Sequence, residues 1–194
     1  MRELLLGPKR FSDLRERLDG ISPSVLTERL ARVEALGLVG RSVLPPPAAS
    51  TVYELTENGQ ALRPAVYELI RWGGRFLHPR RKGDRAEPEW MRLALDALAC
   101  RGTSPPRRFL LRVREGRKEA LVHVAGGRGG TTVSVGAAPA DATLVLDVPT
   151  LLDVASGRLP LSRAVASGAV EASGNLAALP DFARLFESPG PAQR

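Results

Sequence analysis

Residues 22–59 decide the fold of the first half of this chain. They begin with Ser22-Pro23-Ser24-Val25-Leu26-Thr27-Glu28-Arg29-Leu30-Ala31-Arg32-Val33-Glu34-Ala35-Leu36-Gly37. Ser22 is a favoured N-cap residue, Pro23 suits the first turn of a helix, and Gly37 suits the left-handed position that closes one. The stretch therefore predicts a capped helix that ends at Gly37.

A predicted β-hairpin follows this helix. Residues 39–44 and 51–55 have the composition of strands, and residues 45–50 form the tip, whose prolines cannot join a ladder. A capped helix, a hairpin and a further helix, in that order, are typical of a winged helix-turn-helix, which presents one helix to the DNA major groove. The order favours a regulator of transcription over an enzyme.

Two other helices are predicted in the first half. One covers residues 11–18 and is expected to begin at a Ser12 cap. The other is capped by Thr56 and is expected to run to about Leu77, with Pro64 placed to kink or divide it. The first half is therefore predicted to be mostly helical.

The helix that opens at Ser22 has an apolar face and a polar face. Leu26, Leu30 and Val33 form the apolar stripe, since each residue turns the helix by about 100°. The opposite face is expected to carry Ser24, Thr27, Glu28, Ala31 and Ala35. The N-terminal turns of such a helix reach base edges, so the polar members of this face are candidate base contacts.

Each candidate on this face has a chemical role. The hydroxyls of Ser24 and Thr27 can meet either donors or acceptors, and Glu28 can accept from a cytosine amino group. Arg32 lies beside this face and Arg29 nearer the core side, and both suit a phosphate or a pair within the helix. An alternative stays open, in which Glu28 and Arg32 form only a surface ion pair worth roughly a few tenths of a kcal/mol.

Further residues are candidates for the phosphate backbone. Lys9, Arg10 and Ser12 stand at the start of the helix of residues 11–18, where backbone N–H groups and positive charge suit a phosphate. Arg41 lies on the first strand of the hairpin. The full predicted DNA-binding set is Lys9, Arg10, Ser12, Ser22, Ser24, Thr27, Glu28, Arg32 and Arg41.

The chain is basic, with a formal net charge of +7 and 25 arginines against 3 lysines. Excess positive charge favours polyanionic partners, nucleic acid first, although a preference for arginine can also reflect genome composition. Residues 1–84 carry a net charge of +4 and residues 85–194 carry +3, so charge does not say which half binds DNA. No apolar run approaches the ~20 residues of a membrane helix, and a cytoplasmic location is expected by default.

The pattern changes in the second half. Residues 78–88 are charged and bracketed by prolines, so they are predicted to be an exposed linker, whose basic residues 80–82 could alternatively touch a phosphate backbone. Predicted strands cover residues 109–114, 120–124, 131–135, 142–146 and 169–172. Predicted helices cover residues 90–100, 151–155 and 161–166, and a last one starts near residue 175 or 180 and ends at 186. These elements predict an α+β domain with its own core.

Nothing in the sequence predicts an enzyme. There is no Gly-x-Ser-x-Gly elbow, no phosphate loop and no His-Glu-x-x-His motif. The glycine-rich residues 126–130 link two strands and are predicted to be a turn. His123 is either exposed or a polar group in an apolar cavity, and Cys100, among alanines and leucines, is more typical of a small core residue than of a sensor. A lone cysteine excludes an intramolecular disulfide and a multi-cysteine metal site. Together with the missing motifs, this predicts no metal, no cofactor and no catalytic residue.

The first half resembles the HxlR-type winged-helix regulators of bacteria over about residues 1–77. The resemblance is carried by residues 2–14, 20–23, 26–30, 34–39 and 52–59 and by Trp72. It implies a homodimer that binds palindromic operator DNA. In that family a longer first helix precedes the Glu-Leu-Leu motif of residues 3–5, so the N-terminal helix is expected to be incomplete in this chain.

The second half is similar to sterol carrier protein-type lipid-binding domains over about residues 88–187. The similarity is carried by residues 140–147, 152–159, 164–168, 170–175 and 185–186. It implies a sheet with helices over one face and an apolar tunnel between them. The alanine, valine and leucine side chains of this half can fill a core as easily as they can line a cavity.

These observations predict an α+β fold: a winged helix-turn-helix domain over residues 1–77, a linker over 78–88, a sterol-carrier-like domain over 89–187 and a disordered tail over 188–194. Two functions stay open. The first is a transcriptional regulator that binds double-stranded DNA as a homodimer and responds to a small apolar ligand in the second domain. The second is a lipid-binding or protein-interaction module whose winged helix does not bind DNA.

Overall fold

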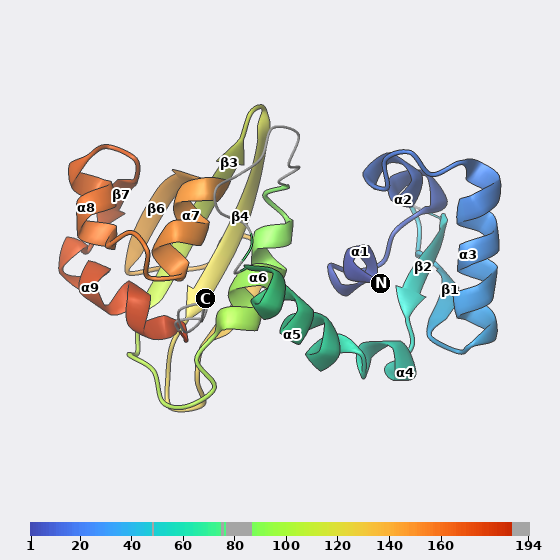
Figure 1. Cartoon of the computed structure of the whole chain (residues 1–194), viewed down its shortest axis with the longest axis horizontal. Helices are drawn as coiled ribbons and strands as arrows, with labels where there is room; N and C mark the ends of the chain where they lie inside the picture. Colours follow the sequence, from blue (N-terminus) through green and yellow to red (C-terminus); the bar gives the residue numbers. More distant parts are fainter. Residues whose placement is uncertain (48, 75, 77–86, 188–194) are drawn as a thin grey trace. The chain divides into compact units, whose positions relative to one another are not determined.

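The computed structural model describes residues 1–47, 49–74, 76 and 87–187 (Figure 1). The chain divides into two compact units, residues 1–66 and residues 67–194. The division falls inside helix α5 (Arg63–Gly74), eleven residues before the predicted end of the first domain at 77. The basic residues 80–82 and the predicted tail of residues 188–194 lie outside the described residues.

Unit 1 contains four helices, the last of them short, and one hairpin, before α5 begins (Figure 1). In chain order these elements are α1 (Arg2–Leu5), α2 (Phe11–Arg17), α3 (Pro23–Ala35), β1 (Val39–Val43), β2 (Thr51–Leu55) and α4 (Glu57–Gln60). The buried side chains of this unit come from the helices and from both strands, and include Leu14, Leu26, Leu30, Val39 and Val52. The unit has the predicted winged helix-turn-helix order of elements.

The β1–β2 hairpin carries a third backbone segment. The two strands are antiparallel, with Val39 opposite Leu55 and Val43 opposite Thr51. On the other side of β2, the Lys9 N–H donates to the Tyr53 carbonyl oxygen at 3.0 Å, and the Tyr53 N–H donates back to Lys9 at 2.8 Å. This bridge fixes the start of α2 against the hairpin.

Three of the predicted helix boundaries in unit 1 are confirmed and one is wrong. Ser22 caps α3, since its Oγ accepts the Val25 N–H at 3.3 Å, and Gly37 closes that helix with φ +66°. The predicted long helix divides between α4 and α5, close to Pro64. Ser12 does not cap α2, because the helix begins at Phe11 with Arg10 as its N-cap residue.

Unit 2 is built on a five-stranded sheet with the order β5-β4-β3-β6-β7. Its strands are β3 (Arg108–Glu115), β4 (Lys118–Ala125), β5 (Thr132–Val135), β6 (Ala142–Asp147) and β7 (Glu171–Gly174). β3 and β6 run parallel, and the other neighbours are antiparallel. Its helical segments are α6 (Trp90–Leu98), α7 (Val148–Ala155), α8 (Leu161–Ala166), η1 (Leu176–Ala178), α9 (Leu179–Phe182) and η2 (Ala183–Leu185).

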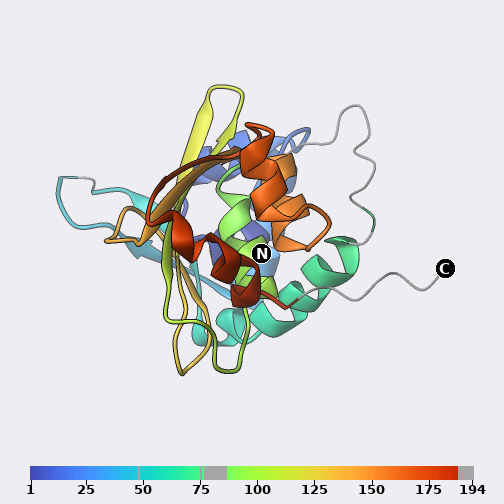
Figure 2. The ribbon, with the colours of Figure 1, turned by 90° about the vertical axis from the view of Figure 1, so that its left-hand side faces the viewer.

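The helices of unit 2 cover one face of this sheet (Figures 1 and 2). Strand residues alternate between the faces, so Phe109, Leu111 and Val113 point into the covered face and are fully buried. The helices add apolar side chains such as Leu151 and Phe182, whose ring meets the ring of Phe109 edge-on at 5.0 Å. One layer of packed apolar side chains therefore lies between sheet and helices. The sheet with helices over one face agrees with the prediction, and the apolar tunnel stays a prediction.

Four details of unit 2 differ from the sequence predictions. The seventh helix begins at Val148 rather than 151, because Asp147 accepts the Thr150 N–H at 2.8 Å and caps it. β7 lies two residues later than predicted, and the predicted last helix is broken into η1, α9 and η2. The end of the predicted exposed linker is buried, since Glu87 binds the Lys118 Nζ at 2.8 Å.

The glycine-rich run is a turn between strands, as predicted. Residues 126–131 connect β4 to β5, and the Ser104 Oγ accepts the Gly127 N–H at 3.1 Å. A Cβ at Gly126 would lie 2.1 Å from the carbonyl oxygen of Pro105. The glycine is needed for this close approach of two loops, so its role is structural.

Candidate nucleic-acid interface

Helix α3 has one buried face and one exposed face, as its spacing predicts. Leu26 and Leu30 are 2% and 6% exposed and pack into the core of unit 1, and Val33 is half-buried. The residues predicted for the opposite face are all exposed: Ser24, Thr27, Glu28, Ala31 and Ala35. The polar side of the helix is therefore open to a partner.

The C-terminus of α3 is fixed to the rest of unit 1. The Thr56 Oγ1 donates to the Gly37 carbonyl oxygen at 2.6 Å, and the Thr56 Oγ1 itself accepts the Gly59 N–H at 3.1 Å. The Leu38 carbonyl oxygen accepts the Thr56 N–H at 3.1 Å. One threonine thus caps α4 and holds the end of α3, which gives the exposed face a defined position within its unit.

The hydroxyl groups at the start of α3 are partly engaged within the helix. The Thr27 Oγ1 donates to the Pro23 carbonyl oxygen at 2.9 Å, which leaves its lone pairs free to accept from a base amino group. The Ser22 and Ser24 Oγ atoms lie 3.1 Å apart and share a hydrogen bond. Ser22 serves as the cap, so Ser24 and Thr27 are the hydroxyls best placed to reach a base.

Glu28 and Arg32 do not form the surface ion pair that the sequence left open. Both side chains are exposed, and neither has an ion pair or side-chain hydrogen bond within the described residues. The Glu28 carboxylate therefore has both oxygens available as acceptors, and the Arg32 guanidinium has its donors available for a phosphate.

The N-terminus of α2 already holds a carboxylate. The Asp13 Oδ2 accepts the Arg10 N–H at 3.0 Å, and the Ser12 Oγ donates to Asp13 Oδ1 at 3.4 Å. A phosphate would meet this negative charge at the helix end, which weakens the predicted role of the backbone N–H groups and of Ser12. The side chains of Lys9 and Arg10, which have no carboxylate partner among the described residues, stay available.

Arg41 lies on the hairpin in a row with two other side chains. Arg41 is opposite Tyr53 on β2, and Tyr53 is opposite Lys9, so the three side chains share one face of the hairpin. The Arg41 guanidinium lies 5.2 Å from the centre of the Tyr53 ring and donates to Glu34 Oε2 at 2.7 Å. The hydrogen bond to Glu34 raises the pKa of Arg41 and ties the hairpin to the last turn of α3.

Two candidate residues were missed from the sequence. Arg15 is exposed and has no ion pair within the described part of unit 1, and Tyr53 places a half-buried ring between Lys9 and Arg41. Arg29, expected nearer the core side of α3, is exposed and also has no ion pair there. With Lys9, Arg10 and Arg32, these arginines surround the start of α2 and the length of α3.

Other features that bear on function lie in unit 2. His123 is on the sheet face away from the helices, with its Nε2 3.1 Å from the Pro139 carbonyl oxygen, so it is not a polar group of the apolar layer. Cys100 is half-buried rather than in the core, with its Sγ 3.8 Å from the Gly102 carbonyl oxygen. Among the described residues, no group of three or more His, Cys, Asp or Glu side chains could hold a metal ion. No helix in the described ranges is long and apolar enough to cross a bilayer.

Comparison with known proteins assigns a family to each half. Residues 1–81 match the HxlR-like helix-turn-helix family, and residues 85–187 match the SCP-2 sterol transfer family. The HTH-type transcriptional regulator YodB of Bacillus subtilis (strain 168) is 40% identical over 76 residues, which are 39% of this chain and 68% of YodB. YvaP, an uncharacterized HTH-type transcriptional regulator of the same strain, is 38% identical over 77 residues, 40% of this chain and 71% of YvaP.

The solved structure of the reduced form of YodB covers 41% of this chain and 78% of its own, with 38% sequence identity and a TM-score of 0.35. The relatives are transcriptional regulators, which supports a DNA-binding regulator as the functional class of unit 1. The chain belongs to the HxlR-like helix-turn-helix family through its first half and to the SCP-2 sterol transfer family through its second.

Proposed function

We propose that this chain is a transcriptional regulator whose helix α3 enters the major groove of double-stranded DNA. The observation that carries the proposal is the exposed face of α3. It presents the Ser24 and Thr27 hydroxyls and the Glu28 carboxylate, whose oxygens no described residue occupies, and Arg29 and Arg32 flank it without acidic partners among the described residues. Base edges need such acceptors, and phosphates need such cations.

The test is a selection from a random pool of 30-base-pair duplexes with the full chain, followed by fluorescence anisotropy on the selected sequence. Thr27→Ala is expected to relax the preference at one base position, since a good base contact gives about 1–3 kcal/mol of discrimination. Thr132→Ala, an exposed threonine of unit 2, is the matched control and should change nothing. Failure to select any sequence from the pool would rule out sequence-specific DNA binding.

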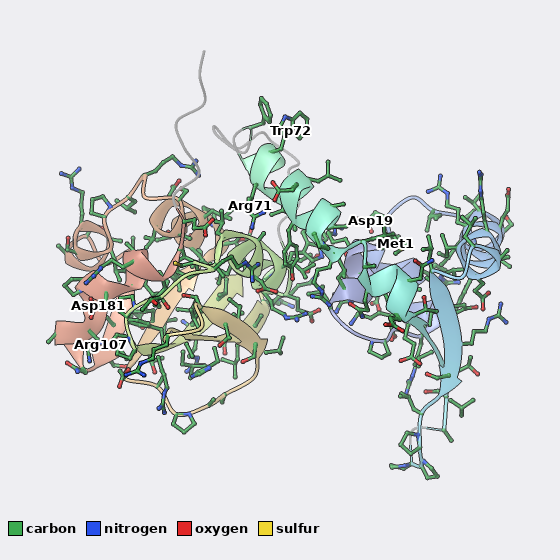
Figure 3. The ribbon with its side chains drawn as sticks, turned by 90° about the horizontal axis from the view of Figure 1, so that it is seen from below. Met1, Asp19, Arg71, Trp72, Arg107 and Asp181 are labelled. Carbon is green, nitrogen blue, oxygen red and sulfur yellow. The ribbon has the colours of Figure 1, made fainter. Side chains whose placement is uncertain are left out.

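The chain is further proposed to act as a homodimer through α5. Leu69 and Trp72 are 65% and 60% exposed on this helix, and Phe76 beyond it is also 65% exposed. The rings of Trp72 and Phe76 meet edge-on at 5.0 Å, and Trp72 projects outward from the end of the helix (Figure 3). Leu62, Ala65, Leu69, Trp72 and Phe76 follow the 3-4 spacing of a two-helix seam, which suits a second copy of the same helix.

Sedimentation velocity of the full chain tests the seam. The wild type is expected to sediment as a dimer at micromolar concentration, and Leu69→Glu as a monomer, because a charge at the centre of an apolar seam opposes its own copy. Leu176→Glu changes another leucine, 52% exposed, in unit 2 and should leave the dimer intact. A wild-type monomer at these concentrations would contradict the assignment.

We further propose that unit 2 binds a small apolar molecule and that this binding alters the affinity of unit 1 for DNA. Membership of the SCP-2 sterol transfer family supports the ligand class, and we assign the ligand to the apolar layer between sheet and helices. Helix α5 supports an effect on DNA binding, because it begins in unit 1 and continues into unit 2 without a break.

Within unit 2, α5 is attached to α6. Tyr67 is buried, and its hydroxyl donates to the Asp96 carboxylate on α6. α6 itself contributes Met91 and Leu95, and the following Ala99, to the apolar layer. A molecule bound in the layer would therefore contact this helix. Such a molecule changes DNA binding only if it prefers one of two positions of α6 and α5.

Mass spectrometry of organic extracts of the purified chain tests for a bound apolar molecule, and palmitic acid serves as the first added probe. Added palmitic acid is expected to change the DNA affinity of the wild type. Tyr67→Phe should bind the probe equally well and show a smaller change, since it removes only the hydroxyl that reaches Asp96. Arg71→Gln, which breaks the Arg71–Glu68 pair on the same helix, is the control.

A second function is supported by the same family membership: a lipid-binding or protein-interaction module whose winged helix does not bind DNA. The two functions predict opposite results in the duplex selection. A chain that retains a lipid through purification but selects no DNA would belong to the second class.

A further inference from the structure

The carboxylate of Glu34 lies at the unfavourable end of α3. Glu34 stands in the last turn of the helix, and the first turn holds no acidic residue. The helix dipole stabilises negative charge at the N-terminus and disfavours it at the C-terminus. A residue that breaks a local rule of this kind is expected to have a compensating partner or a function.

The partner of Glu34 is on the hairpin. Its Oε2 atom accepts a hydrogen bond from the Arg41 guanidinium at 2.7 Å, and Arg41 belongs to β1, which lies beside α3 (Figure 1). The same guanidinium lies 5.2 Å from the centre of the Tyr53 ring on β2, within the range of a cation–π contact. The Tyr53 backbone is paired in turn with Lys9, just before α2. The contacts of Glu34, Arg41 and Tyr53, called the clamp below, therefore join the end of α3 to both strands of the hairpin.

The clamp makes Arg41 a poor partner for a phosphate. A phosphate that drew Arg41 away would leave the Glu34 carboxylate beside the negative end of the helix without its cation. A phosphate that bound Arg41 in place would meet the negative charge of Glu34 at the same guanidinium. A role in holding α3 has neither cost, so the geometry favours it over the phosphate contact that the sequence predicts.

We propose that Glu34 and Arg41 are positioning residues for DNA recognition. The clamp keeps the C-terminal end of α3 fixed against the hairpin in the free protein, so the polar face of the helix reaches the bases in one orientation. Thr56 holds the same helix end, and the clamp adds the contact with the hairpin. A preorganised surface binds more tightly, because no free energy of binding is used to order it. The inference rests on the proposed DNA binding by α3.

The test compares Glu34→Gln, Arg41→Gln and the double variant with the wild type, as full chains on the duplex selected above, by fluorescence anisotropy. Each single variant is expected to bind about twofold to fivefold more weakly, which is the range that an exposed ion pair allows. The double variant should bind no more weakly than either single one, since both substitutions break the same contact. The salt slope of log K should stay at the wild-type value, because no phosphate contact is lost.

A phosphate contact at Arg41 predicts the opposite sign for one of these variants. Glu34→Gln would then free the guanidinium, and the affinity and the salt slope would both rise. Arg41→Gln would lower the salt slope by about one. Either result would overturn the positioning role.

Glu54→Gln is the matched control. Glu54 follows Tyr53 on the opposite face of β2 and has no ion pair among the described residues. The substitution makes the same change of charge on the same hairpin, and it should leave the affinity and the salt slope nearly unchanged. An equal loss of affinity in Glu34→Gln and Glu54→Gln would mean that the contact with Arg41 plays no part.

The base preference separates positioning from a role in stability alone. In a selection from the random pool, Glu34→Gln should relax the preference at several base positions together, because the whole polar face of α3 loses its fixed orientation. The melting temperatures of Glu34→Gln and the wild type should differ little, since an exposed pair contributes little to stability. A clearly lower melting temperature with an unchanged base preference would overturn the inference.

Exchange of the two charges gives an independent readout. Arg41→Glu alone brings two carboxylates together and should relax the base preference further than Arg41→Gln does. Arg41→Glu combined with Glu34→Arg forms the pair again and should restore the preference. A double variant that stays as relaxed as Arg41→Glu would contradict the clamp.

The proposed function and this inference fail in different ways. A wild type that selects no sequence from the pool overturns both of them. A wild type that selects a sequence, with Glu34→Gln selecting the same sequence equally strongly, overturns the positioning role alone.

Discussion

Unit 1 holds 9 basic and 8 acidic residues, a net charge of +1, and unit 2 holds 19 and 13, a net charge of +6, yet the units differ most in where their unpaired cations lie. In unit 1, Lys9, Arg10, Arg15, Arg29 and Arg32 have no ion pair within the described residues, and all five gather on or beside α2 and α3. In the described part of unit 2, seven arginines bind carboxylates, whereas Arg108, Arg117, Arg128 and Arg163 have no ion pair and lie apart, on β3, on two turns and on α8. Arg112 and Arg114 share Glu119, and Arg107 and Arg184 share Asp181, with Arg107 and Asp181 side by side (Figure 3).

The difference decides which half is equipped for a polyanion. An arginine that already donates to a carboxylate must give up that partner before it can neutralise a phosphate, whereas an unpaired arginine only releases counterions. Net charge favours unit 2 and hides this distinction. The gathering of unpaired cations on and beside α2 and α3, which only the fold shows, favours unit 1 as the partner for DNA.

The largest expected effect comes from removing unpaired cations of unit 1. Arg10→Ala combined with Arg32→Ala should weaken DNA binding about a hundredfold, because a hydrogen bond to a charged group contributes about 1.5–3 kcal/mol. The salt slope of log K should fall by about two units, one for each phosphate contact. Anisotropy titrations between low and moderate salt measure both quantities.

The matched double variant removes paired cations of unit 2, Arg112→Ala with Arg114→Ala. It has the same net charge as the first variant and should keep nearly all of the affinity and the salt slope. Equal losses in the two variants would mean that net charge matters and pairing does not. A change of sequence preference in the unit 1 variant with affinity intact would contradict the phosphate assignment.

A smaller effect is expected from the exposed carboxylate of α3. Glu28→Gln keeps the shape of the side chain but turns one acceptor into a donor, so the preference for cytosine at one position should fall roughly tenfold. The total affinity for random DNA should rise slightly, because one negative charge leaves the interface. Glu16→Gln, an exposed glutamate of α2, is the control and should leave the base preference unchanged. Selection experiments with the three proteins compare the preferred bases.

Most of the fold could be predicted from local signals. Ser22, Pro23 and Gly37 define α3, and apolar alternation defines β3, β4 and β6 to within one or two residues. The errors fall where local signals compete. Ser12 has the side chain of an N-cap residue, but α2 begins before it, and the Asp13 carboxylate accepts the Arg10 N–H. The broken final helix was missed because its short turns are held by packing of Phe182 and Leu185.

The candidate site was less predictable than the fold. Helical periodicity identified the exposed face of α3, since burial of Leu26 and Leu30 requires it. Ion pairing was not predictable in the same way. The local pair that spacing allows between Glu28 and Arg32 is absent among the described residues, whereas Glu34 pairs with Arg41 on another element. Partners distant in sequence depend on how elements pack, which spacing alone does not contain.

A third prediction concerns arginines of unit 2 that lose the carboxylate they bind. In the background of Arg10→Ala and Arg32→Ala, Asp181→Asn should release Arg107 and Arg184 and raise non-specific DNA binding by up to about threefold, with a steeper salt slope. Glu171→Gln adds the same net charge but breaks no ion pair among the described residues. If both variants raise binding equally, release of paired arginines contributes nothing beyond charge.

The smallest expected effect is a pH dependence of the stability of unit 2. Hydrogen bonds from Arg114 and Arg112 lower the pKa of the Glu119 carboxyl below its ordinary value of 4.5. A carboxyl with a lowered pKa in the folded state stabilises the fold above the unfolded pKa, and this contribution is lost as the pH falls through the folded pKa. The melting temperature of Glu119→Gln should therefore lie slightly below that of the wild type at pH 7, and this gap in melting temperature should close below about pH 4.

Because all three side chains are largely open to solvent, salt should shrink the gap as well. Glu16→Gln, in unit 1, should show no such closing gap in the same thermal denaturation series. A gap that stays constant from pH 7 to pH 3 would mean that Glu119 acts through packing, and that the paired arginines of unit 2 owe their positions to the sheet and little to their carboxylate.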